Sequence, residues 1–415
     1  MEQSMLRKVF LIMLLFAVLA TAGVQGYFSP TQPFDEPLWL MRSRVMPWDT
    51  SDRLKQFWAI DGPAVNRWAY TIGLKASGWY APHPDEPPCW SYDGDKVLFF
   101  GDLTSGSVRL STLRPGPPCS WEWVHGPTAP RKAILAMRAS NLLGYGILLI
   151  LLWLAGRAAL GHEVLAAVAV APFVMASVWR EWLAVICNSG DVWMLAGMAG
   201  ALYAWLCLAR RRTRWGAAAV GFACGFAIAA KYPAVLALAA FCGWAVFHCR
   251  GRERVLSPLA AGLASFLTWV ALNPAIWTWP DGPTAFFRAS VEMRQSGMVW
   301  LVSRLGRSSA RYILVHCGYW WPFLPVVAVV FWRCRKEWWF APVAWWSVVV
   351  AVGTFAGILW LGDASDRYRL PMELGAWFAG SIAVLSLGHN AGKTRPEDSC
   401  GISQHLHTRS TVGIS

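Results

Sequence analysis

Ionisable residues gather at the ends of several long apolar runs in this sequence. Asp35 and Glu36 open a long polar stretch, Asp191 begins one apolar run, and Lys231 ends another. The sequence Asp366–Arg369 precedes the last run. Carboxylates at such positions can accept protons, and cations can bind anionic groups. The set suggests a site that handles an anionic lipid headgroup and a proton, with simple exposure to interfacial water as the alternative for each residue.

The apolar runs dominate the composition. Hydrophobic residues make up 56% of the 415 residues, charged residues make up 15%, and 28 residues are Trp. This profile is typical of a chain whose main solvent is lipid. Runs long enough to cross the hydrocarbon layer predict an all-α polytopic membrane protein with about ten transmembrane helices. They lie near residues 9–28, 133–154, 162–183, 192–208, 215–230, 233–247, 256–276, 312–331, 338–361 and 370–387.

The net charge is +13, and the charged residues are distributed unevenly among the loops between these runs. Lys and Arg cluster in alternate loops, whereas most Asp and Glu fall in the others, which is the positive-inside pattern. The charge therefore reports topology, and we expect no nucleic-acid partner. Both termini are predicted to be cytoplasmic, in the cytoplasmic membrane of a bacterial cell, with the candidate site extracytoplasmic. Residues 1–28 also resemble a secretory signal, so cleavage of this first helix is the alternative to a permanent anchor.

The loop after the first helix is far longer than the others, and loops of this length are usually functional. Two amphipathic stretches predict helices that lie on the membrane surface. Arg42 and Asp49 fall on the predicted wet face of the first helix. A small hairpin-like insertion is expected between residues 82 and 130. The apolar stripes are Phe34, Leu38, Met41 and Val45 in the first stretch, and Val65, Trp68, Ile72 and Ala76 in the second.

Cys89 and Cys119 are the cysteines of this loop. An oxidising compartment would let them form a disulfide, worth roughly 3 kcal/mol on the chain-entropy model, and two free thiols are the alternative. Within the fifth apolar run, the spacing of Gly221 and Gly225 permits close helix packing.

We divide the chain into a first transmembrane helix (1–28), an extracytoplasmic loop (29–131), a transmembrane bundle of about nine helices (132–388) and a disordered cytoplasmic tail (389–415).

Five short motifs occur in an order that resembles the GT-C superfamily of polyprenyl-phosphate-dependent glycosyltransferases, in the protein O-mannosyltransferase and aminoarabinose transferase branch. Asp61-Gly62-Pro63 departs from the His-Pro-Pro of many relatives, and the C-terminal domain of some relatives is not expected here. The motifs are Phe34–Glu36, Arg138–Asn141, Gly225–Pro233 with its terminal Lys-Tyr-Pro, Asn273-Pro274 with Trp277, and Asp366–Pro371.

The resemblance implies a GT-C-like fold and an enzyme that transfers a hexose or pentose from a polyprenyl-phosphate donor to a protein, lipid or glycan acceptor. The family's catalytic base matches Asp35 first and Glu36 second. Its phosphate-binding positions match Lys231, Arg367 and Tyr368. We add Asp61, Asp191 and Asp366 as candidate substrate-binding residues.

Cofactor needs and rival functions remain open at this stage. No His or Cys cluster has metal-ligand spacing, so no cofactor is predicted, although scattered carboxylates leave a divalent metal ion open. The main rival is a transporter or flippase for a lipid-linked sugar, which would be expected to carry polar or broken-helix features near the bilayer midplane. An assembly or anchoring protein that keeps the fold without the activity is the third reading.

Overall fold

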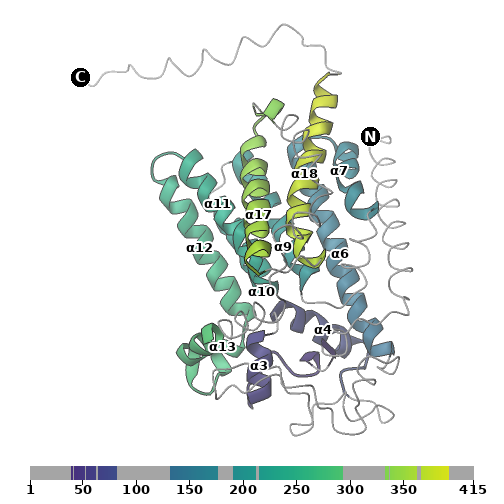
Figure 1. Ribbon diagram of the computed structural model, residues 1–415, viewed down its shortest axis with the longest axis vertical. Helices are drawn as coiled ribbons and strands as arrows, with labels where there is room; N and C mark the ends of the chain where they lie inside the picture. The colour runs from purple at the N-terminus through teal and green to yellow at the C-terminus, as the bar shows by residue number, and fades with distance from the viewer. Residues whose placement is uncertain are drawn as a thin grey trace, which may run out of the picture.

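The computed structural model describes residues 39–81, 131–175, 190–292, 332–361 and 366–391, apart from residues 41, 52, 62, 63, 212–214 and 336 within these ranges. All regular secondary structure in these residues is helical. The apolar helices run alongside one another, and the smaller helices α3 and α13 lie with α4 at the end of the bundle away from the C-terminus (Figure 1).

Eight of the predicted apolar runs coincide with helices of the bundle. Five helices are long and apolar enough to cross a membrane, namely α6, α9, α12, α17 and α18, and α7, α10 and α11 are shorter apolar helices. The prediction of a polytopic membrane protein is thus supported, whereas the runs at 9–28 and 312–331 lie outside the described residues. The bounds are α6 Arg131–Leu160, α7 Glu163–Met175, α9 Asp191–Arg211, α10 Gly216–Ala230, α11 Val235–His248, α12 Glu253–Leu272, α17 Phe340–Leu361 and α18 Asp366–Ala391.

Two helix boundaries are set by proline. α10 ends at Ala230, Lys231 is extended (φ −166°, ψ 134°), and Pro233 lies in the short 3₁₀ helix Tyr232–Ala234 that leads into α11. α12 ends at Leu272 rather than at the predicted 276, and α13 (Ala275–Thr278) follows as a separate turn. Proline lacks an N–H and disfavours helical backbone in the residue before it, so α12 cannot continue through Asn273 and Pro274.

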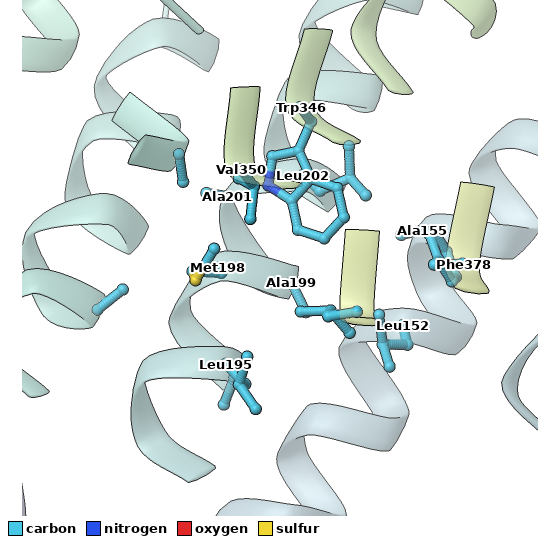
Figure 2. Close-up of a cluster of buried hydrophobic side chains, with 14 of the residues drawn as sticks. Leu152, Ala155, Leu195, Met198, Ala199, Ala201, Leu202, Trp346, Val350 and Phe378 are labelled. Carbon is cyan, nitrogen blue, oxygen red and sulfur yellow. The ribbon is translucent and has the colours of Figure 1, made fainter. Parts of the chain in front are cut away.

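The core of the bundle surrounds α9. Within its apolar span 67% of the residues are buried, compared with 17% in α12, which places α9 at the centre and α12 at the periphery. Figure 2 shows Leu195, Met198 and Leu202 of α9 among side chains of the neighbouring helices, including Trp346 of α17 and Phe378 of α18. Burial of such side chains contributes about 1.5–3 kcal/mol each in water, and close packing replaces that term within lipid.

The paired glycines of α10 allow close contact with α12, as the sequence predicted. A Cβ built on Gly221 would overlap the carbonyl oxygen of Ala261, and one on Gly225 would overlap the carbonyl oxygen of Ser265. Two helix backbones therefore touch at two successive turns. Only glycine permits this approach, which explains the four-residue spacing.

The long loop that the sequence predicts to be external contributes a helical layer that we call the external module, residues 39–81. It contains α3 (Arg53–Asp61), which was not predicted, and α4 (Ala64–Ala76), which begins directly after Pro63 as predicted. The indole N–H of Trp68 donates to the Leu272 carbonyl at 3.1 Å, and the Thr50 hydroxyl donates to the Thr278 carbonyl. Apolar side chains also join the module to the segment after α12: Ala59 and Ile60 pack with Ala275, Ile276, Trp279 and Phe286.

The first amphipathic stretch differs from its prediction. Residues 39–40 and 42–43 are helical, and turns begin at Arg44. Arg42 was expected to face water but is buried, and its guanidinium carbon lies 5.4 Å from the ring centroid of Trp39. Phe34 and Leu38 lie outside the described residues. Spacing alone could not reveal that residues 42–46 are covered by α4.

In the second stretch, α4, the expected apolar stripe is only partly buried. Val65 is buried, whereas Ile72 is 60% exposed and Ala76 is also exposed. The face that packs inward carries Asn66, Arg67, Tyr70, Thr71 and Leu74. An exposed apolar face suits a helix lying against lipid, with its polar face turned onto the protein.

Candidate functional site

A buried ion pair joins two helix ends where the bundle meets the external module. Lys231 follows the last residue of α10, and Asp191 is the first residue of α9. The Lys231 Nζ lies 2.5 Å from the Asp191 Oδ1, with side-chain exposures of 15% and 5%. Antiparallel packing of α9 and α10 brings together residues that are 40 positions apart.

Each charge of this pair also suits its own helix end. A carboxylate at a helix N-terminus and a cation at a C-terminus each gain about 0.3–1 kcal/mol from the helix dipole. The ion pair is therefore favourable in the absence of any ligand. The Lys231 ammonium has three N–H donors, and its side chain is 15% exposed.

Gly190 brings the external module against this pair. Its φ of +79° is easily reached only by glycine, and a Cβ there would overlap the Ala230 carbonyl. The same Cβ would lie 3.1 Å from the side-chain oxygen of Asn66 on α4. The beginning of α9, the end of α10 and the first turn of α4 therefore meet at one point.

The Arg138–Asn141 motif positions α4. The Tyr70 hydroxyl donates to the Asn141 Oδ1 at 2.9 Å, and the Ser140 hydroxyl donates to the Ala69 carbonyl at 3.0 Å. Gly73 of α4 has no room for a side chain, because a Cβ would lie 2.5 Å from the Ser140 Oγ. The motif thus serves as a polar docking surface on α6, and it fixes α4 relative to the bundle.

Four arginines of the external module and α6 are buried, namely Arg42, Arg44, Arg67 and Arg138. Arg44 donates to the Trp79 carbonyl at 3.2 Å, which ties the segment before α3 to the residues after α4. Arg67 donates to the Met46 carbonyl at 3.0 Å. Buried arginines are usually paired or hydrogen-bonded, and such contacts help to hold the external module together.

Burial, and after it the charge of Arg42, lower the pKa of Arg67 to about 10 against the opposing effects of Asp49 and Tyr80. Burial raises the pKa of Asp49, but hydrogen bonds from Lys55 and Ser51 outweigh it, so the net pKa is below its usual value. The Lys55 Nζ lies 2.7 Å from the Asp49 Oδ2. Asp49 is thus hydrogen-bonded to Lys55 and Ser51.

The structure brings together two of the residues that the sequence singled out, Lys231 and Asp191. Asp61 is the last residue of α3, and Asp366, Arg367 and Tyr368 form the first turn of α18; for these four the structure describes backbone only. The candidate bases Asp35 and Glu36 and the candidate disulfide Cys89–Cys119 lie outside the described residues.

Sequence reasoning missed the polar face of α4 and the buried arginines. The available signal was the helical spacing of Arg67 and Thr71 and of Tyr70 and Leu74, which forms a second face beside the apolar stripe.

Among the described residues no group of three His, Cys, Asp or Glu side chains is placed to hold a metal ion. No protein-family model matches this sequence, and no curated protein or solved structure matches it either.

Proposed function

We propose that the protein is an integral membrane glycosyltransferase that moves a sugar from a polyprenyl-phosphate donor to an acceptor at the extracytoplasmic surface. The observation that carries the proposal is the junction of Lys231 and Asp191 with α4, where a partly exposed cation lies at the end of the bundle. The order of motifs that resembles the GT-C superfamily supplies the substrate class. The helical bundle with several candidate membrane spans is compatible with that resemblance.

The reaction requires positive charge at the leaving phosphate. An acceptor hydroxyl attacks the anomeric carbon, the bond from that carbon to the phosphate oxygen breaks, and its electron pair leaves with the polyprenyl phosphate. Charge-assisted hydrogen bonds from a fixed cation stabilise this group as its charge grows. Lys231 is proposed for this role, because its ammonium is held at the junction by Asp191 and is still 15% exposed. Arg367 and Tyr368 are proposed as further donors.

The acceptor proton needs a carboxylate as its base. Asp35 is the first choice for this role and Glu36 the second, as the resemblance implies. Trp39, the first described residue after this acidic pair, is buried and packs edge-to-face on Tyr70 of α4, with ring centroids 5.8 Å apart. Trp39 therefore packs on the helix whose Asn66 faces Gly190, the residue before Asp191. This connection supports one site built from both parts.

The test is sugar transfer in membranes, with radiolabelled polyprenyl-phosphate sugars and matched protein levels. Wild type, Asp35→Asn, Glu36→Gln and Lys231→Met are compared with Asp281→Asn, which removes an exposed carboxylate after α13. We expect transfer by wild type and by the Asp281 variant, and a loss of about 10²–10⁴-fold without the base.

Each result has a distinct meaning. Retained transfer in the Asp35 variant with loss in the Glu36 variant would assign the base to Glu36. Full transfer by both variants would refute a base in the acidic pair. No transfer by wild type from any donor would refute the transferase and favour a transporter of lipid-linked sugars.

A further inference from the structure

α12 lies at the edge of the bundle and leaves one of its faces uncovered (Figure 1). Its apolar span is 17% buried, the lowest value of the five candidate membrane spans. The exposed apolar side chains recur every three or four residues, which places them on one face of the helix. We call this face the α12 stripe, and each of its side chains is more than half exposed: Val255, Leu256, Leu259, Leu263, Phe266 and Leu267.

The α12 stripe has the length of one membrane leaflet. From Val255 to Leu267 the helix rises about 18 Å at 1.5 Å per residue, and the hydrocarbon of one leaflet is about 15 Å thick. Gly262 lies on the same face between Leu259 and Phe266, and a Cβ built on it meets no atom within 4 Å. The stripe therefore offers open apolar surface along which a lipid acyl chain can lie.

An aromatic cluster lies beside the turn that leads into α12. The His248 ring stacks on Trp244 with the ring centroids 6.1 Å apart, and Phe247 stacks on Trp345 of α17 with the centroids 5.5 Å apart. Tryptophan is enriched where helices leave the hydrocarbon. Because His248 is the last residue of α11, the turn after it is expected at the depth of the lipid headgroups.

This turn, residues 250–254, carries three exposed arginines, and we call it the basic turn. Gly251 has a φ of +56°, which glycine reaches easily, so the turn is tight. The Arg254 Nε donates to the Cys249 carbonyl at 2.9 Å. Arg250 and Arg252 make no ion pair with any residue that the structure describes. Two guanidinium groups are thus available to a ligand at the beginning of the α12 stripe.

The basic turn contains one carboxylate, which is directed to its own helix. The Glu253 Oε2 accepts a hydrogen bond from the hydroxyl of the buried Ser257 at 2.9 Å. Three arginines against one glutamate leave the turn positively charged. The planar guanidinium fork matches the oxygens of a phosphate group.

Charge also selects between the possible occupants of the α12 stripe. Two copies of this chain in one membrane have the same orientation, so a two-fold contact through the stripe would bring two basic turns together. Their like charges would oppose that contact. An anionic phospholipid instead brings negative charge to the basic turn and apolar surface to the stripe.

We propose that the basic turn and the α12 stripe bind an anionic phospholipid, with its phosphate on Arg250 and Arg252 and an acyl chain along α12. The site lies at the opposite end of α11 from Lys231, because α11 begins after the short helix that follows Lys231 and ends before the basic turn. None of the residues proposed for sugar transfer takes part. The proposal therefore does not depend on transferase activity.

The experiment is photo-crosslinking of the purified full chain in phosphatidylcholine nanodiscs. The probe is phosphatidylglycerol with a diazirine in its acyl chain, and the labelled peptides are mapped by mass spectrometry. Wild type, Arg250→Gln, Arg252→Gln and the double variant are compared with Arg288→Gln, which removes an exposed arginine beyond the other end of α12. Competition by unlabelled phosphatidylglycerol gives an apparent affinity, and a diazirine probe with a choline headgroup measures labelling without net charge. A thermal scan of each variant reports its folding.

We expect the phosphatidylglycerol probe to label residues 252–267 in wild type and in the Arg288 variant. Each single variant of the basic turn should weaken the apparent affinity about fivefold, and the double variant roughly 30-fold, as each arginine near an anionic lipid surface contributes about that much. The choline probe should label the same peptide at least about fivefold less. Should the double variant fail to fold, the fivefold effect of either folded single variant supports the site.

Three results would overturn the proposal. Equal labelling by the choline probe would mean that the α12 stripe contacts bulk lipid without selecting its charge. An unchanged affinity in the folded double variant would remove the arginines from the site. Absence of label from residues 252–267 would mean that something else covers the stripe, and a disulfide between two copies of Leu263→Cys would then identify a second copy of the chain.

Discussion

Removing Lys231 should destabilise the protein more than removing its partner. Lys231→Met leaves the Asp191 carboxylate 5% exposed and without its cation. Breaking a buried pair costs about 3–5 kcal/mol, and the N-terminus of α9 recovers about 0.3–1 kcal/mol by stabilising the carboxylate. We therefore expect a net loss of about 2–4 kcal/mol of unfolding free energy. Asp191→Asn should cost less, about 1–2 kcal/mol, because the flexible lysine can reach water.

A double-mutant cycle isolates the interaction. Unfolding free energies of the wild type, both single variants and Lys231→Met with Asp191→Asn are measured by denaturant titration in mixed micelles. The double variant should be less destabilised than the sum of the singles, with a coupling of about 1–3 kcal/mol. The matched control is the Arg157–Glu163 pair at the α6–α7 turn, whose nitrogen and oxygen are 3.3 Å apart with side-chain exposures of 51% and 25%.

The control pair should couple by no more than about 1 kcal/mol, because exposed pairs are screened by water. The reasoning fails if the Lys231 and Asp191 variants are additive within about 0.5 kcal/mol. It also fails if Lys231→Met is as stable as wild type. Either result would mean that the junction is wet, and the case for Lys231 as a held phosphate ligand would lose its physical basis.

Two further predictions concern packing and pH. Gly225→Ala should lower Tm by several degrees in a thermal scan, because its Cβ meets the Ser265 backbone, whereas Gly262→Ala has open space and should leave Tm unchanged. For Asp49, a folded-state pKa below 3.8 contributes stability above pH 3.8 that is lost as pH falls through the folded pKa. Asp49→Asn should therefore flatten the acid limb of a Tm-against-pH curve, and an unchanged limb would contradict this assignment.

The helices of the bundle could be predicted because their cause is local. Apolar runs of sufficient length must form helices in lipid, where each backbone polar group needs a partner within its own segment. The runs that became α9, α10 and α11 were placed within a few residues of their observed bounds. The same reasoning held for Gly221 and Gly225, because a four-residue glycine spacing exposes backbone on one helix face.

The external module was harder to predict because its helices have two usable faces. The apolar stripe of α4 is real, and Ile72 on that stripe is exposed in the structure. What decided the buried face was the polar surface of α6, where Asn141 accepts a hydrogen bond from Tyr70, a residue 71 positions earlier. Helical spacing shows which residues share a face, but it does not show what the face will contact.

By itself, the sequence determined the helical character of the chain, the positions of most bundle helices and the break before Pro233, all of which follow from local backbone and solvation physics. Tertiary structure alone decided that Asp191 meets Lys231 and that Arg67 is buried beside Met46. Both contacts join segments that are distant in sequence, so they depend on the packing of whole helices, and residue types or spacing along one segment do not encode that packing.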